Sequence, residues 1–175
     1  MLPNLRMLKD RIKSLAQAYK QEVIANRRHL HSHPELSFKE YETAAFVAEK
    51  LKEIGITEIE SKATTGWSAL IKGKNPEKKV VALRADMDAL PIIEANEVPY
   101  KSQNPGVMHA CGHDAHIAVL LGVASFLSRN TDKLNGDILL IFQPAEEGAP
   151  EGEEGGAELM LKEGIFDTET PDAIF

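Results

Sequence analysis

The chain of 175 residues carries 20 Lys and Arg against 27 Asp and Glu, a formal net charge of −7. Its 27% charged and 43% hydrophobic residues are typical of a globular domain that can bury a core. No basic cluster interrupts this acidic balance, so we do not expect nucleic acid or another polyanion as a partner.

The start of the chain gives no sign of a targeting segment. The first residues, MLPNLRMLKDRIKSLAQAYK, are charged throughout and lack the apolar run of a signal peptide. No apolar run elsewhere is long enough to span a bilayer. Cys111 is the single cysteine, so no disulfide can form within the chain. We therefore expect a cytoplasmic protein without a membrane partner.

Two helices are predicted in the first third of the chain. Apolar residues at helical spacing indicate a long amphipathic helix that ends near His31. Residues 37–40 (SFKE) have the form of a capping box, with Leu36 and Tyr41 as a hydrophobic staple. Gly55 is a natural stop for the second helix. This helix should bury Ala44, Ala48, Leu51 and Ile54.

Strands and helices alternate in the rest of the chain. We expect strands at 57–63, 67–72, 80–83 and 136–142, and helices at 111–127 and 157–162. This alternation predicts an α/β fold, a three-layer sandwich in which helices flank a mixed sheet. No linker divides the chain, so residues 1–175 should belong to one domain.

The histidines form two groups, and the second surrounds the cysteine. The segment 108–114 reads MHACGHD and joins a loop to a predicted helix. Cysteine and histidine are soft ligands that select zinc-like metals, and Gly112 lets the backbone turn sharply between them. Two other interpretations stay open: a buried thiol beside histidines at a helix start, and a thiol nucleophile paired with an imidazole base.

Acidic pairs follow two of the predicted strands. Glu146 and Glu147 come after the last strand, and ligands commonly gather at the carboxyl ends of α/β strands. Neighbouring carboxylates in an extended chain point to different sides, so one could bind metal while the other takes a proton from water. Asp86 and Asp88 share one face, and either could hold a ligand histidine by its second nitrogen. The alternative for Glu146 and Glu147 is an ordinary solvated loop. The alternative for Asp86 and Asp88 is a turn cap at the end of a strand.

Several motifs occur together in one order. RRHLHSHPELSFKEYET is followed by RADMDALP, MHACGHDAH, QPAEEG and GGAELM. The chain, from about Arg27 to its end, resembles the metal-dependent family of hippurate hydrolases, N-acyl-amino-acid amidohydrolases and auxin-conjugate hydrolases. The resemblance implies the N-terminal part of a zinc-peptidase-like catalytic domain. It also implies a small N-acyl amino acid as substrate, whose amide bond is hydrolysed by metal-activated water. A dipeptidase or aminoacylase of the same superfamily, and a non-catalytic metal-binding fragment, remain alternatives.

The resemblance also assigns roles to particular residues. Cys111 corresponds to a ligand that bridges two divalent cations, which could be zinc, manganese, cobalt or nickel. His113 and Glu147 correspond to further metal ligands, and Glu146 to the general base. Asp88 matches the acidic residue of the strand-end motif.

The family pattern extends beyond these residues. His33 and Glu35 match its early motif, and we expect a structural role for both. Family members are longer, with a lid or dimerisation domain and further histidine ligands, whereas the last histidine here is His116. We therefore expect this chain to be a truncated, inactive portion, and the full-length protein to be a homodimer or higher oligomer.

Overall fold

The computed structural model describes residues 3–75, 79–149 and 151–175. Its elements in chain order are α1 (Pro3–Ser32), α2 (Tyr41–Glu53), β1 (Ile59–Lys62), β2 (Gly66–Ile71), β3 (Val80–Asp86), α3 (His113–Ser128), the 3-10 helix η1 (Thr131–Lys133), β4 (Asp137–Gln143), α4 (Gly156–Lys162) and β5 (Ala173–Ile174). Within the described ranges, no helix is both long and apolar enough to cross a membrane.

The strands form one mixed sheet with the order β1-β2-β4-β3-β5. β3 runs parallel to β4 and to β5, whereas β2 runs antiparallel to β1 and to β4. β3 and β4 stay in register from Val80 opposite Asp137 to Asp86 opposite Gln143. The carboxyl ends of these two strands therefore lie side by side, and the predicted mixed-sheet α/β fold is confirmed.

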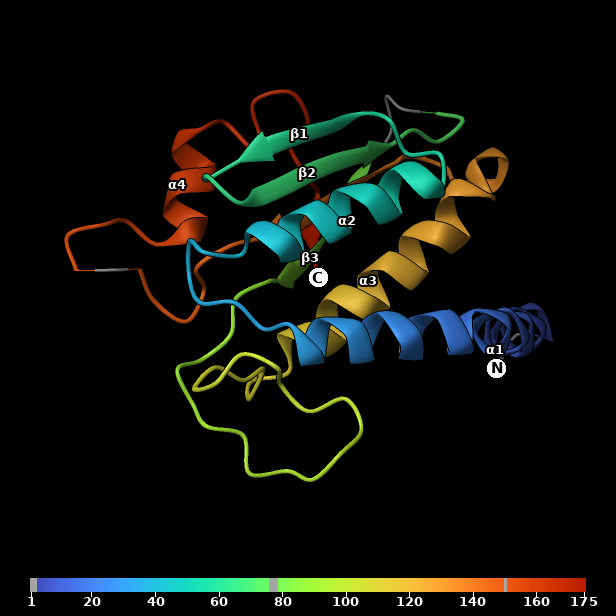
Figure 1. The fold of residues 1–175 in the computed structure, drawn as a ribbon. Coiled ribbons are helices and arrows are strands. Elements are labelled where there is room, and N and C mark those ends of the chain that lie inside the picture. The colour runs from blue at the N-terminus through green and yellow to red at the C-terminus, as the bar shows by residue number, and fades with distance from the viewer. Residues whose placement is uncertain (1–2, 76–78, 150) are drawn as a thin grey trace.

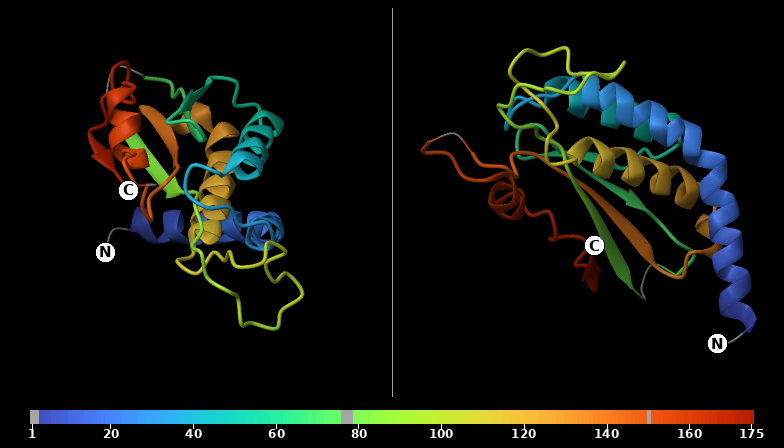
Figure 2. Two further views of the ribbon diagram at one scale, coloured as in Figure 1. Left: turned by 60° about the vertical axis from the view of Figure 1, so that its left-hand side comes forward. Right: turned by 90° about the horizontal axis from the view of Figure 1, so that it is seen from below.

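Helices cover the two faces of this sheet unequally. α2 and α3 lie on one face, α1 packs along α3, and α4 lies on the opposite face (Figures 1 and 2). Side chains of β4 alternate between the two cores, as the period of a strand requires. Leu140 and Phe142 belong to the larger core beneath α2 and α3, and Leu139 and Ile141 to the smaller core with α4.

The predicted capping box at the start of α2 is wrong. No side chain of residues 37–40 caps the helix; instead, the Glu35 carboxylate accepts hydrogen bonds from the backbone N–H groups of Glu42 and Thr43, at 3.2 and 2.8 Å. Tyr41 is 60% exposed and is no staple. A carboxylate at a helix N-terminus satisfies free N–H groups and suits the helix dipole, so Glu35 has the structural role expected of it.

Several element boundaries also differ from expectation. β3 runs three residues past the predicted 80–83 to Asp86, because its polar end still pairs with β4 in the parallel ladder. α3 begins at His113 rather than Cys111. The stop after α2 is confirmed: Ile54 is the C-cap, only partly buried, and Gly55 follows with φ of +83°. β5 and η1 were not expected.

Candidate metal centre

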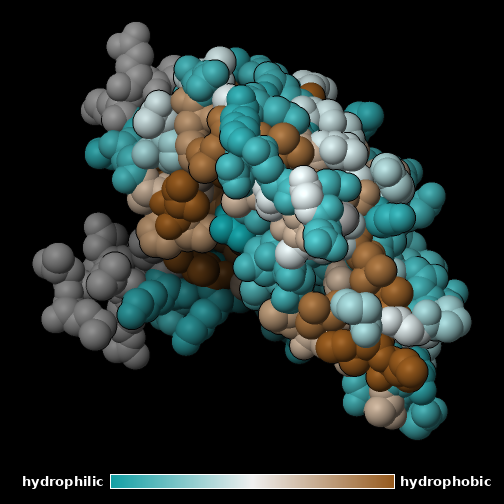
Figure 3. Space-filling model, turned by 90° about the vertical axis from the view of Figure 1, so that its left-hand side faces the viewer, coloured by the Kyte–Doolittle hydropathy of each residue, from teal (hydrophilic) through white to brown (hydrophobic). Residues whose placement is uncertain are grey.

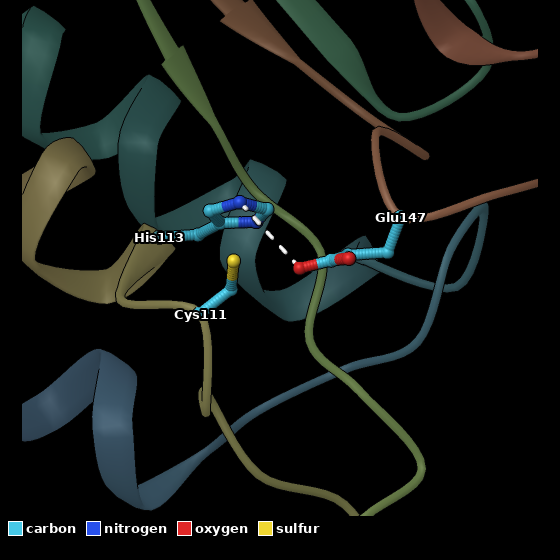
Figure 4. Close-up of side chains that lie close together, drawn as sticks. All are labelled: Cys111, His113 and Glu147. Atoms are coloured by element: carbon cyan, nitrogen blue, oxygen red, sulfur yellow. Dashed lines mark ion pairs between the residues drawn. The ribbon is translucent and has the colours of Figure 1, made fainter.

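The three residues expected to bind metal come together at the ends of β3 and β4. The Cys111 thiol, the His113 imidazole and the Glu147 carboxylate each offer a ligand atom, and these atoms lie within 4.8 Å of one another. Figure 4 shows the three side chains pointing toward one another, from the start of α3 and from the loop that follows β4. Segments more than thirty residues apart in sequence thus meet at one point.

Gly112 makes the sharp turn between two of these residues. Its φ of +92° lies in the left-handed region, which glycine adopts at little cost. A Cβ at this position would meet no atom within 4 Å, so conformation rather than space explains the glycine. The turn lets Cys111, in the loop, and His113, the first residue of α3, face the same side.

Asp88 fixes the orientation of the His113 ring. Nδ1–H of His113 donates to the Asp88 carbonyl oxygen at 2.9 Å, and the Asp88 carboxylate lies 3.3 Å from the same nitrogen. Nε2 is therefore the free atom of the ring. The buried Asp88 carboxylate also accepts hydrogen bonds from the Ser37 hydroxyl and from the backbone N–H of Glu147, both at 2.9 Å. We expected either Asp86 or Asp88 to hold a ligand histidine by its second nitrogen, and Asp88 is the residue that does so.

The protonation of the centre reflects its crowded acidic groups. Burial alone would lower the pKa of His113, but the hydrogen bonds and negative charge of Asp88 raise this pKa to about 9. The neighbouring Glu147 carboxylate raises the pKa of the Cys111 thiol. The Cys111 thiol and the His113 imidazole each hold a proton, and a bound cation would take the place of that proton.

Both glutamates of the loop approach the same imidazole. Nε2 of His113 lies 3.7 Å from Oε2 of Glu146 and 3.8 Å from Oε1 of Glu147. The expectation that neighbouring carboxylates diverge was wrong here, because the chain is not extended: the backbone bends at Glu146 and Glu147, directly after Ala145 with its φ of +48°. The side chain of Glu146 is 39% exposed and that of Glu147 20%, so the two still differ in their access to solvent.

A buried glutamate missed by the sequence analysis holds this loop. Glu40 is 0% exposed, and its two carboxylate oxygens accept from the backbone N–H of Ala145 at 2.9 Å and the Thr65 hydroxyl at 2.7 Å. Burial raises the pKa of Glu40, against the effect of these hydrogen bonds. The pattern around Glu40 suggested a capping box, and no local signal showed that its side chain reaches Ala145 in the loop after β4.

The residues of the centre fit a divalent cation. Oε1 of Glu147 is buried and has no hydrogen-bond partner among the described residues, which is costly for a carboxylate oxygen. Thiolate, imidazole and carboxylate are the ligands that zinc and its neighbours prefer. A second group, Asp86 with His113 and Glu146, also lies within 4.8 Å. However, Asp86 already pairs with Arg84 at 2.6 Å, so the group with Glu147 is the better site.

Comparison with known proteins supports the same reading of the motifs. A family model described as peptidase family M20/M25/M40 matches residues 82–175, which is more than half of the chain. The chain belongs to peptidase family M20/M25/M40. This assignment confirms the resemblance drawn from the motifs.

Relatives of this M20 chain include enzymes that act on amide bonds by name. It is 51% identical over 161 residues to the N-acyl-L-amino acid amidohydrolase of Geobacillus stearothermophilus, covering 92% of this chain and 42% of that protein. It is 46% identical over 162 residues to thermostable carboxypeptidase 2 of Saccharolobus solfataricus, covering 91% and 40%. The crystal structure of a dinuclear metal-binding M20 peptidase from Bacillus subtilis matches with a TM-score of 0.81 and 43% identity, covering 91% and 42%. The M20 chain thus spans about two fifths of the length of these relatives.

Proposed function

We propose that this M20 chain carries the metal-holding part of an amidohydrolase that cleaves the amide bond of N-acyl amino acids. The observation that carries the proposal is the meeting of Cys111, His113 and Glu147, with a buried Glu147 oxygen that has no hydrogen-bond partner in the described part of the chain. Relatives named as an N-acyl-L-amino acid amidohydrolase and a carboxypeptidase support this substrate class. The chain spans about two fifths of their length, and we propose this activity for the complete protein.

The arrangement suggests how the residues divide the work. Cys111, His113 and Glu147 would hold metal, with two divalent cations (zinc, manganese, cobalt or nickel) in the complete enzyme. Such ions supply Lewis acidity toward an amide carbonyl and a water molecule. Glu146, the more exposed carboxylate, takes a proton from the attacking water and returns it to the leaving nitrogen. The water oxygen bonds to the carbonyl carbon as the C–N bond breaks, so the products are a carboxylic acid and an amino acid, without an acyl-enzyme.

A cysteine hydrolase is the less well supported alternative. A nucleophilic cysteine needs a lowered pKa so that the thiolate is available. The carboxylate of Glu147 instead raises the pKa of Cys111. Chelation separates the two mechanisms, because hydrolysis by a thiolate would survive complete removal of metal.

We also propose that the full-length protein associates into a homodimer or higher oligomer. Figure 3 shows hydrophobic side chains gathered in patches on the face that carries α4. On α4 the large apolar side chain of Leu161 is 57% exposed. Exposed apolar patches commonly mark contact surfaces.

The decisive experiment uses a version extended through the length of its relatives. We expect hydrolysis of a panel of N-acyl amino acids that is lost on chelation and restored by a divalent cation. Cys111→Ser should lower the metal content, because a hydroxyl is a poorer ligand for zinc-like ions. Hydrolysis that persists after complete chelation would contradict the metal mechanism.

A further inference from the structure

A buried network of charged side chains lies beside the metal centre. His31, near the end of α1, stands between two carboxylates: Nδ1 is 2.6 Å from Oδ2 of Asp114, and Nε2 is 3.0 Å from Oε1 of Glu94. The three side chains are 4%, 0% and 1% exposed. Nε of Arg27 lies 3.0 Å from the same Asp114 oxygen. Each ring nitrogen of His31 thus faces a carboxylate oxygen, which can only accept, and Nδ1 also lies 3.2 Å from Nη2 of Arg27.

One end of the network holds the long loop that leads to Cys111. Glu94 lies in this loop, and its second carboxylate oxygen accepts from the backbone N–H of Ser102 at 2.7 Å. Leu90 and Met108 exchange two backbone hydrogen bonds at 3.0 Å, which closes the loop three residues before Cys111. The contact from Glu94 to His31 therefore attaches a closed loop to α1.

The other end of the network holds the start of α3. Asp114 directly follows His113 in the first turn of this helix, where a negative side chain is favourable. Gly112 gives the turn between loop and helix its freedom, so the position of Cys111 depends on how the chain is held on either side. His31 contacts a residue on each side of this turn: Glu94 in the loop and Asp114 in α3.

We propose that His31 is a positioning residue for the metal centre. By fixing the loop through Glu94 and α3 through Asp114, it keeps Cys111 and His113 turned toward the glutamates. This inference rests on the proposed function, since it concerns the same ligands. Residues that orient metal ligands from outside typically change metal affinity by about 10–100-fold when they are substituted.

The test compares two variants of the 175-residue chain, each titrated with cobalt(II). Cys111 is the single cysteine, so absorption from a cobalt–thiolate bond reports its position alone. His31→Gln keeps a side-chain donor but loses one of the two contacts, and we expect about 10–100-fold weaker cobalt binding. Val23→Ala is the matched control, because Val23 also lies on α1, packs against the core, approaches Gly122 of α3, and makes none of the hydrogen bonds or ion pairs of the network. It should lower the thermal midpoint and leave cobalt affinity unchanged.

Each outcome decides one point. Equal loss of cobalt affinity in Val23→Ala, at a matched loss of stability, would overturn the positioning role, as would unchanged affinity in His31→Gln. If His31→Gln does not fold, Glu94→Gln keeps the shape, removes one charge and should weaken binding in the same direction. A wild-type chain that takes up no cobalt would overturn the proposed function and this inference together. Uptake that neither network variant alters would overturn the inference alone.

Discussion

The contact between α4 and the loop after β4 allows a sharp test of how the glutamates are placed. Gly156 begins α4, and a Cβ there would lie 1.7 Å from the carbonyl oxygen of Pro144. Ordinary contact begins at 3.4 Å, so Gly156→Ala requires a shift of 3.4 − 1.7 = 1.7 Å. The obstructing atoms are backbone, and that peptide leads directly into Ala145 and Glu146. The substitution must therefore move the glutamates, α4 or both.

The Gly156→Ala substitution should lower both the stability of the chain and the turnover of the extended enzyme. Overpacking of this kind costs about 1–3 kcal/mol of the free energy of unfolding. At roughly 2–4 °C per kcal/mol for a domain of this size, the thermal midpoint should fall by about 2–12 °C. Displacing a catalytic group by about 1 Å costs on the order of 10²-fold in rate, so turnover of the extended enzyme should suffer more than stability does.

Gly155→Ala is the control for this prediction. Gly155 has φ of −64°, and a Cβ at this position would meet no atom within 4 Å. Thermal unfolding and cobalt uptake of both variants should show wild-type behaviour for Gly155→Ala and losses in both measurements for Gly156→Ala. Unchanged stability of Gly156→Ala would refute the steric argument. Unchanged cobalt uptake despite a lower midpoint would show that α4 does not set the position of Glu147.

Three further predictions concern the carboxylates and the chain as a whole. In an extended version, Glu146→Gln should keep its metal and lose nearly all turnover, whereas Glu147→Gln should lose metal; the reverse pattern would exchange their roles. Burial raises the pKa of Glu40 above its ordinary 4.5, so its favourable contribution to stability is present at low pH and is lost as pH rises through the folded pKa. Urea unfolding should therefore show the stability of wild type relative to Glu40→Gln falling as pH rises above 4.5, and a rise would contradict this sign. Finally, the 175 residues alone should show no metal-dependent hydrolysis of N-acyl amino acids, because a two-cation site needs more ligands than Cys111, His113 and Glu147; efficient turnover would disprove this.

Hydrophobic periodicity was sufficient to place most elements of this fold. The apolar run of β4 and the helical spacing in α3 are strong local signals, because both elements are largely buried. The spacing in α1 also placed its helix, although Ile12 is 52% exposed and the burial lies near the end of the helix. The polar end of β3 gave no such signal. Arg84 and Asp86 belong to the strand only because β4 offers them backbone partners, which sequence pattern cannot show.

The candidate site was predictable as a set of residues but not as an arrangement. The order of the motifs was enough to expect Cys111, His113 and Glu147 to come together. The left-handed Ala145, directly before the two glutamates, has no signal in the sequence, because alanine seldom adopts this conformation. The burial of Glu40 was equally hidden, since it depends on contacts with segments far along the chain.

The proposed ligands all fall within one β–α–β segment, from β3 through α3 to the loop after β4. Because this segment is contiguous, it can be grafted as one piece into another α/β scaffold to introduce a metal site. Glu40 and His31, which hold the loop of the glutamates and the start of α3, lie outside this segment. A graft limited to residues 80–147 would carry every proposed ligand and lose both supports. A designer would have to rebuild these two buried contacts in the host, since loosely held ligands are a common failure of designed sites.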